Sequence, residues 1–172
     1  MPADRPWHEP TRDIPLRWGT YRGRCLAGLL FIVSGSLALQ GANPRILYLL
    51  LAGTVFHTVG WAIMPSQGWR RLVVAAPNIA VTWLLLTGPQ SVWMLAVPYL
   101  SWLLVRQRPL RSYITLLFVL CASIVTVQLL HEYAAMPLAL AVSAVVLAAS
   151  AWVARLLAAT VRPASQFADV VG

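Results

Sequence analysis

Long apolar runs alternate with short polar segments along most of this chain. Six such runs can be delimited, at residues 25–40, 46–64, 72–87, 91–105, 113–130 and 137–157. A helix that crosses a membrane needs about 20 apolar residues, and about 17–25 is the usual range. The third and fourth runs are short, at about 24 Å of helix, so we expect flanking residues to extend them or the bilayer to thin there. The pattern predicts six transmembrane helices.

The connections between the runs are short, and they pair the runs into three hairpins. Gly88 and Pro89 separate the third run from the fourth, which leaves room only for a tight turn. The predicted fold is therefore an all-α membrane protein with six transmembrane helices in three hairpins. Its expected parts are a basic N-terminal tail at 1–24, a transmembrane domain at 25–160 and a C-terminal tail at 161–172.

The basic residues predict the orientation of the helices. All 13 are Arg, and 12 of them lie in the two tails, at the end of the sixth run, or in the second and fourth connections. Arg45 alone lies in the other connections. Positive charge favours the cytoplasmic side, so both termini are expected in the cytoplasm. The exclusive use of Arg is typical of a GC-rich bacterium, which makes a bacterial cell membrane the expected location.

Composition changes how the net charge of +8 is interpreted. Apolar residues make up 59% of the chain and charged residues only 10%, against about 25% charged in soluble domains. In a soluble protein such a charge would indicate nucleic acid. Here the Arg residues border apolar runs, so anionic lipid headgroups are the expected partner and nucleic acid is not. The predicted headgroup contacts are Arg70, Arg71, Arg106, Arg108, Arg111 and Arg155.

Three strongly polar side chains interrupt the apolar runs at one depth. His57, Asn78 and Tyr99 each lie about 10 Å from the predicted cytoplasmic edge. Pro77 and Pro98 precede two of them, and each proline should free a carbonyl one turn earlier. Freed carbonyls inside a bilayer need partners. We therefore predict that this polar layer faces the bundle interior, at a local break where the three side chains form hydrogen bonds.

The layer has three interpretations. The first is helix packing, in which each polar contact contributes about 1 kcal/mol. The second is a small ligand-binding cavity open to the cytoplasm, and the third is a catalytic site. No run contains a carboxylate, the chain has no Lys, and its three His residues are scattered. This argues against a carboxylate proton relay, a Schiff base and a His metal cluster. No catalytic residue, metal or cofactor is predicted.

Small residues recur at helical spacing in the sixth run. Close approach of membrane helices favours small side chains. This stripe is expected to pack inside the bundle or against a partner membrane protein, and its members are Ala141, Ala144, Ala148 and Ala151.

Tryptophans concentrate near the two predicted membrane edges. Those on the cytoplasmic side are Trp18, Trp61, Trp69, Trp102 and Trp152. Such a distribution is typical of an aromatic belt at the lipid interface.

These patterns favour a small multi-pass integral membrane protein without catalytic activity. It would be a transport or channel component, or an accessory subunit of a membrane complex. The alternative is a membrane-embedded enzyme that acts on a lipid or isoprenoid. In that case His57 would be the acid/base and Tyr99 a hydrogen-bond donor.

Overall fold

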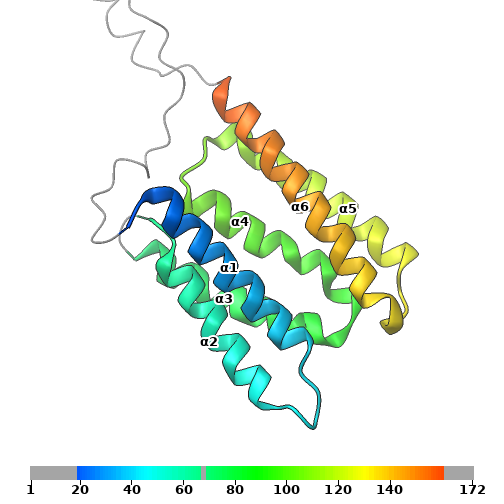
Figure 1. Ribbon diagram of the computed structural model, residues 1–172. Coiled ribbons are helices and arrows are strands. Elements are labelled where there is room, and N and C mark those ends of the chain that lie inside the picture. Colours follow the sequence, from blue (N-terminus) through cyan, green and yellow to red (C-terminus); the bar gives the residue numbers. More distant parts are fainter. Residues whose placement is uncertain (1–18, 67–68, 161–172) are drawn as a thin grey trace, which may run out of the picture.

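All regular structure in the described part of the chain is helical. The computed structural model describes residues 19–66 and 69–160, with six α-helices and several short 3₁₀ segments and no strand in those ranges (Figure 1). The all-α class is therefore confirmed. Three helical segments are long and apolar enough to cross a membrane, namely Tyr21–Gln40, Leu110–Leu129 and Tyr133–Ala159. The predicted tails lie mostly outside the described residues.

The first hairpin consists of α1 (Tyr21–Gln40) and α2 (Tyr48–Ile63). Helix α1 begins four residues before the apolar run that predicted it. Thr20 explains the early start, because its hydroxyl oxygen accepts a hydrogen bond from the Gly23 N–H at 3.1 Å. Such an N-cap satisfies one of the amides that a helix start leaves without a partner.

The second hairpin is built from mixed helix types. Helix α3 (Arg70–Leu84) continues as a 3₁₀ segment, η2 (Leu85–Thr87), and a second 3₁₀ segment, η3 (Pro89–Leu95), leads into α4 (Ala96–Val105). Gly88 separates the two arms with a φ of +116°, a conformation that favours glycine. The tight turn predicted at Gly88 and Pro89 is thus present.

The two prolines near the predicted polar layer differ in position. Pro77 lies inside α3 as expected. Pro98 lies in the first turn of α4, where a missing N–H needs no partner, rather than inside a regular helix. The sequence placed Pro98 inside one apolar run, whereas in the structure the chain changes from 3₁₀ to α geometry just before it.

The third hairpin contains the longest helix. Helix α5 (Thr115–Leu129) follows the 3₁₀ segment η4 (Leu110–Ile114), and α6 (Met136–Ala159) follows the 3₁₀ segment η5 (Tyr133–Ala135). In Figure 1 the α1–α2 pair and the α5–α6 pair lie on opposite sides of the molecule, with α4 between them. Buried apolar clusters join these layers, one between α2, α3 and α4 and another between α4, α5 and α6.

Glycines bring α1 and α2 into backbone contact at two levels. A Cβ added to Gly35 would lie 2.6 Å from the Gly53 carbonyl oxygen, and one added to Gly28 would lie 2.9 Å from that of Gly60. The same overlap arises in the reverse direction at Gly53 and Gly60. No side chain fits at these four positions, so the two helices pack with their main chains touching.

Helix α6 buries a different face from the one predicted. Ala141, Ala144 and Ala148 are exposed and Ala151 is half-buried, so packing of this stripe inside the bundle was a wrong expectation. The buried face carries Ser143 and Ser150 instead, together with Ala139, Ala154 and Ala158. The reason is physical: serine hydroxyls are better placed against protein than against lipid, whereas alanine can face lipid without leaving a polar group there.

Candidate functional site

His57 lies on α2, buried against α1, and both of its ring nitrogens are engaged. The indole N–H of Trp61 donates to Nε2 at 3.1 Å, and Nδ1 lies 3.1 Å from the Ser36 hydroxyl. An indole can only donate, so Nε2 carries no proton. The Ser36 hydroxyl donates to the Ile32 carbonyl at 2.8 Å, so Nδ1–H is the donor to Ser36. The contacts therefore define a neutral imidazole with its proton on Nδ1.

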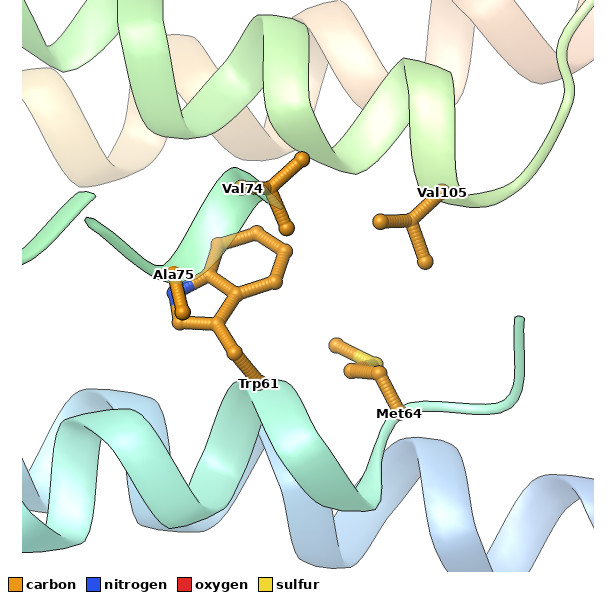
Figure 2. Close-up of a cluster of buried hydrophobic side chains, with 5 residues drawn as sticks. All are labelled: Trp61, Met64, Val74, Ala75 and Val105. Atoms are coloured by element: carbon orange, nitrogen blue, oxygen red, sulfur yellow. The ribbon is translucent and has the colours of Figure 1, made fainter. Parts of the chain in front are cut away.

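The close backbone contact explains why His57 reaches α1. A Cβ on Gly35 would lie 2.5 Å from the His57 backbone nitrogen, so the two main chains meet at this level. Ser36 is the next residue of α1 and comes within reach of the imidazole. One turn along α2, Trp61 packs against Val74 and Ala75 of α3 (Figure 2). The His57 environment thus links all three of these helices.

Asn78 is fully buried in α3 and holds it to α4. Its side-chain amide nitrogen donates to the Ser101 hydroxyl at 2.8 Å and to the Val74 carbonyl one turn earlier. Its Oδ1 atom has no hydrogen-bond partner among the described residues. The amide therefore uses its donors for packing, next to the proline-containing turn of α3.

Tyr99 joins α4 to the start of α5. Its hydroxyl lies 2.6 Å from that of Thr115, and Thr115 donates to the Ser112 carbonyl at 2.6 Å, so Tyr99 is the donor to Thr115. Ser112 in turn donates to the Ala154 carbonyl of α6 at 3.0 Å. This relay fastens the beginning of the third hairpin to both of its neighbours.

The three predicted residues are all buried, but their hydrogen bonds go to other partners. His57 joins α2 to α1, Asn78 joins α3 to α4, and Tyr99 joins α4 to α5. Trp83 of α3 supplies the remaining link, since its indole donates to the Thr54 hydroxyl of α2 at 3.1 Å. The layer is thus a series of contacts between consecutive helices. Ligand binding by these residues stays a prediction.

The described ranges contain few groups that could bind a metal or carry out acid chemistry. No three His, Cys, Asp or Glu side chains lie together in them. Their one acid, Glu132, is exposed in the connection between α5 and α6. Cys25 and Cys121 lie on different helices, and neither is part of a disulfide.

The predicted headgroup residues divide into two groups. Arg70, Arg111 and Arg155 are exposed, whereas Arg108 is buried and Arg106 half-buried against Trp102. The side chain of Arg71 lies outside the described part. Four tryptophans outside the core, Trp69, Trp83, Trp93 and Trp152, are exposed. Trp61 packs against protein rather than facing outward, because this side chain is 2% exposed and bonded to His57.

Sequence reasoning missed the glycine contacts between α1 and α2. The signal was present, because Gly28 and Gly35 have the same seven-residue spacing as Gly53 and Gly60. Seven residues are close to two helical turns, so each pair lies on one helix face. It also missed Ser101 and Thr115, whose hydroxyls become significant only when the neighbouring helix is known. Comparisons with protein-family models, curated proteins and solved structures gave no match.

Proposed function

We propose that this chain is a six-span integral protein of the cell membrane, with both termini in the cytoplasm. We further propose that it works without catalysis, as an accessory subunit of a membrane complex. The observation that carries this proposal is the use of the interior polar groups. His57, Asn78 and Tyr99 are all committed to hydrogen bonds between helices.

This use of polar groups favours a packing role over the other candidate functions. A catalytic imidazole exchanges a proton with its substrate, and both nitrogens of His57 are held by protein donors and acceptors. A transport route needs polar groups that can bind a passing solute. Here His57, Asn78 and Tyr99 are each under 5% exposed, and each bonds to a neighbouring helix. The transport version of the proposal is therefore the weaker one.

The outer surface supports six spans. Large apolar side chains are exposed on every helix, including the shorter ones, for example Leu30 on α1, Leu51 on α2 and Leu104 on α4. Such an apolar exterior is typical of a lipid-facing surface. The 3₁₀ segment before α4 adds length, because 3₁₀ geometry rises about 2.0 Å per residue. Together these 17 residues span about 29 Å, close to the hydrocarbon thickness of a bilayer.

Single-cysteine labelling tests the topology. Cys25 and Cys121 are first replaced by Ala, and single cysteines are then placed at positions 43, 90, 132, 111 and 160. We expect a membrane-impermeant maleimide to label positions 43, 90 and 132 from outside intact cells. Positions 111 and 160 should react only after the membrane is permeabilised. A chain with three spans would give a different alternation, and that result would overturn the six-span arrangement.

Native mass spectrometry tests the accessory role. The protein is extracted gently from its own membrane, and we expect a second protein at a fixed stoichiometry. Retention of a lipid or isoprenoid substrate without any protein partner would instead favour the membrane-embedded enzyme.

The exposed alanine stripe of α6 is where we place the partner. Ala144→Leu and Ala148→Leu should release the partner protein. Ala149→Leu, at a site that is also exposed but lies on an adjacent face of the same helix, should retain it. Equal retention in all three variants would place the partner elsewhere on the molecule.

A further inference from the structure

Two charged side chains of opposite sign lie at the outer end of the molecule, the end that the proposed topology places outside the cell. In that topology the first, third and fifth connections are outside, and their only charged residues are Arg45 and Glu132. Both side chains are exposed, and neither forms an ion pair within the ranges that the structure describes. The two charges therefore do not neutralise each other within one molecule.

These two charges lie at opposite edges of the fold. Arg45 precedes α2, which belongs to the first hairpin, and Glu132 follows α5, which belongs to the third. In Figure 1 α2 and α5 lie at opposite edges of the molecule, and α4 lies between the two hairpins. The outer end therefore has a positive edge beside α2 and a negative edge beside α5.

Each charge is carried on a short turn at the same height. The Arg45 N–H donates to Asn43 Oδ1 at 2.9 Å, and the Glu132 carbonyl accepts from the Ala135 N–H at 2.9 Å. Arg45 lies three residues before α2 begins, and Glu132 lies three residues after α5 ends. The two side chains thus occupy comparable positions beyond the ends of their helices.

A second pair of complementary groups lies just below the charges. Tyr48 is the first residue of α2, Gln128 is the next-to-last residue of α5, and both are exposed. Neither side chain forms a hydrogen bond within the described part of the chain. A glutamine amide both donates and accepts, so it can bond to a tyrosine hydroxyl, and such contacts help to join helices in membranes. The two edges therefore match at this level as well.

Apolar surfaces continue both edges into the membrane. Helix α2 exposes Leu51 and Val55, and α5 exposes Leu117 and Ile124. Such surfaces pack against lipid or against another helix about equally well. An exposed ion pair adds little affinity, but opposite charges favour the matching edge and like charges disfavour the wrong one. The polar groups at the outer end should therefore select which apolar surfaces meet.

We propose that copies of this chain associate side by side in the membrane, with the α2 edge of one copy against the α5 edge of the next. Copies in one membrane share an orientation, so a rotation about the membrane normal relates them and keeps every residue at its depth. Arg45 of one copy then meets Glu132 of the next, and Tyr48 meets Gln128. Because the two edges differ, the contact is head-to-tail and repeats around a closed ring.

Disulfide crosslinking between copies tests the contact. Val55 lies seven residues into α2 and Cys121 eight residues before the end of α5, so both lie about 11–12 Å below the outer helix ends. The full-length protein keeps the exposed Cys121, Cys25 is replaced by Ala, and Val55→Cys is added. Oxidation in the native membrane should give a ladder of dimers and larger products on a non-reducing gel, because each copy carries both partners of the disulfide.

Depth and helix face provide the controls. Leu51→Cys and Val59→Cys, on the same face of α2, lie about 6 Å above and below Val55 and should crosslink less. Val33→Cys is exposed on α1 at the depth of Val55 and should give no ladder. Equal yields from all four variants would show random collision, and dimers through Cys121 alone would show a symmetric contact. Either result, or no product from any α2 cysteine, would overturn the proposal.

Reversal of the charges tests the outer pair. Association is measured in liposomes by energy transfer between copies that carry a single label at Thr160→Cys, with both native cysteines replaced by Ala. Arg45→Glu and Glu132→Arg should each weaken association about fivefold, because each places like charges together, and the double variant should restore it. Arg22→Glu changes an exposed charge at the other end of the molecule and should have no effect. A double variant that stays weak would mean that the two residues do not meet.

The inference rests on the proposed six-span topology, because that topology places both loops on one side of the membrane. Labelling of positions 43 and 132 from outside, together with no ladder and no charge effect, would contradict this association alone. Labelling of only one of these positions would contradict the topology as well. The contact uses α2 and α5, so the alanine stripe of α6 stays available to the proposed partner protein.

Discussion

The first and third hairpins achieve close helix packing in two different ways. Between α1 and α2, glycines face glycines and the main chains touch at two levels. Between α5 and α6, the buried positions carry small side chains, including Thr126, Ser143 and Ser150. The Thr126 and Ser143 hydroxyls bond to their own helices: Thr126 donates to the Ala122 carbonyl at 2.8 Å and Ser143 to that of Ala139 at 2.7 Å.

The difference matters because the hydrophobic effect does little to drive the association of helices within lipid. Association in a membrane depends on van der Waals contact and on hydrogen bonds between helices. The first hairpin uses van der Waals contact and a hydrogen bond, since its close backbone contact also brings Ser36 within hydrogen-bond distance of His57. The third hairpin depends more on shape, because Thr126 and Ser143, along the middle of the pair, use their hydroxyls within one helix. The two interfaces should therefore respond differently to volume and to the loss of a hydroxyl.

The largest effect on stability is expected from a methyl group added at the glycine contact between α1 and α2. In Gly35→Ala the added Cβ meets backbone atoms of His57 and Gly53, which cannot rotate away. We expect a loss of about 2–3 kcal/mol in the free energy of unfolding, even though alanine favours helix. Unfolding in mixed micelles of dodecyl maltoside and SDS measures this quantity.

Gly41→Ala is the matched control for this prediction. A Cβ there would lie 3.4 Å from the nearest atom, the Leu37 carbonyl oxygen, which is an ordinary contact. Its stability should stay within about 0.5 kcal/mol of the parent protein. Equal effects at both positions would mean that α1 and α2 do not touch through their main chains.

Added volume in the third hairpin should cost less. Ala154 of α6 is fully buried, beside Val119 of α5 and Leu103 of α4. Ala154→Val should lower the free energy of unfolding by about 1–2 kcal/mol, because neighbouring side chains can shift where a backbone could not. Ala148→Val adds the same atoms at an exposed position of α6 and should stay within about 0.5 kcal/mol. A larger loss of stability in Ala154→Val than in Gly35→Ala would mean that the third hairpin tolerates added volume less well than the first.

Part of this fold could be predicted from the sequence, and part could not. The all-α class and the approximate helix positions could be predicted, because runs of apolar residues are a strong signal. The 3₁₀ geometry of the segments before α4 and α5 could not, because an apolar run indicates a helix but does not distinguish 3₁₀ from α hydrogen bonding. Which face of α6 is buried also escaped prediction, because alanine suits lipid and protein about equally and only Ser143 and Ser150 favour the interior.

The site was predictable in its members but not in its contacts. His57, Asn78 and Tyr99 stand out because polar groups are costly in an apolar helix. Their partners are hydroxyls such as Ser101 and Thr115, which are common in this sequence and have no distinguishing pattern. Choosing among them requires the rotation of each helix about its axis. The repeated glycine spacing would have supplied that rotation for α1 and α2.

Removal of a single hydroxyl tests how much the hydrogen bond between α1 and α2 contributes to the first hairpin. In Ser36→Ala the Nδ1–H of His57 loses its acceptor in a buried place, which should lower the free energy of unfolding by about 1 kcal/mol. Ser34 provides the control, because it is exposed and donates only to the Phe31 carbonyl of its own helix at 3.2 Å. Ser34→Ala should change stability by less than about 0.5 kcal/mol. Equal losses would show that the Ser36–His57 contact does not hold the helices together.

The smallest effect is expected for the same change in the third hairpin. Ser143 is buried, whereas Ser36 is half-buried. The Ser143 hydroxyl nevertheless donates to the Ala139 carbonyl of its own helix. A serine bonded in this way competes with the helix backbone, and alanine has the higher helix propensity. Ser143→Ala should therefore leave the free energy of unfolding within about 0.5 kcal/mol of the parent, on either side of zero. Ser112→Ala, measured alongside, removes a hydrogen bond from the start of the third hairpin to α6 and should cost about 1 kcal/mol. A larger loss of stability in Ser143→Ala than in Ser112→Ala would mean that hydroxyl contacts along the middle of α5 and α6 hold this hairpin. The third hairpin would then resemble the first more closely than its packing indicates.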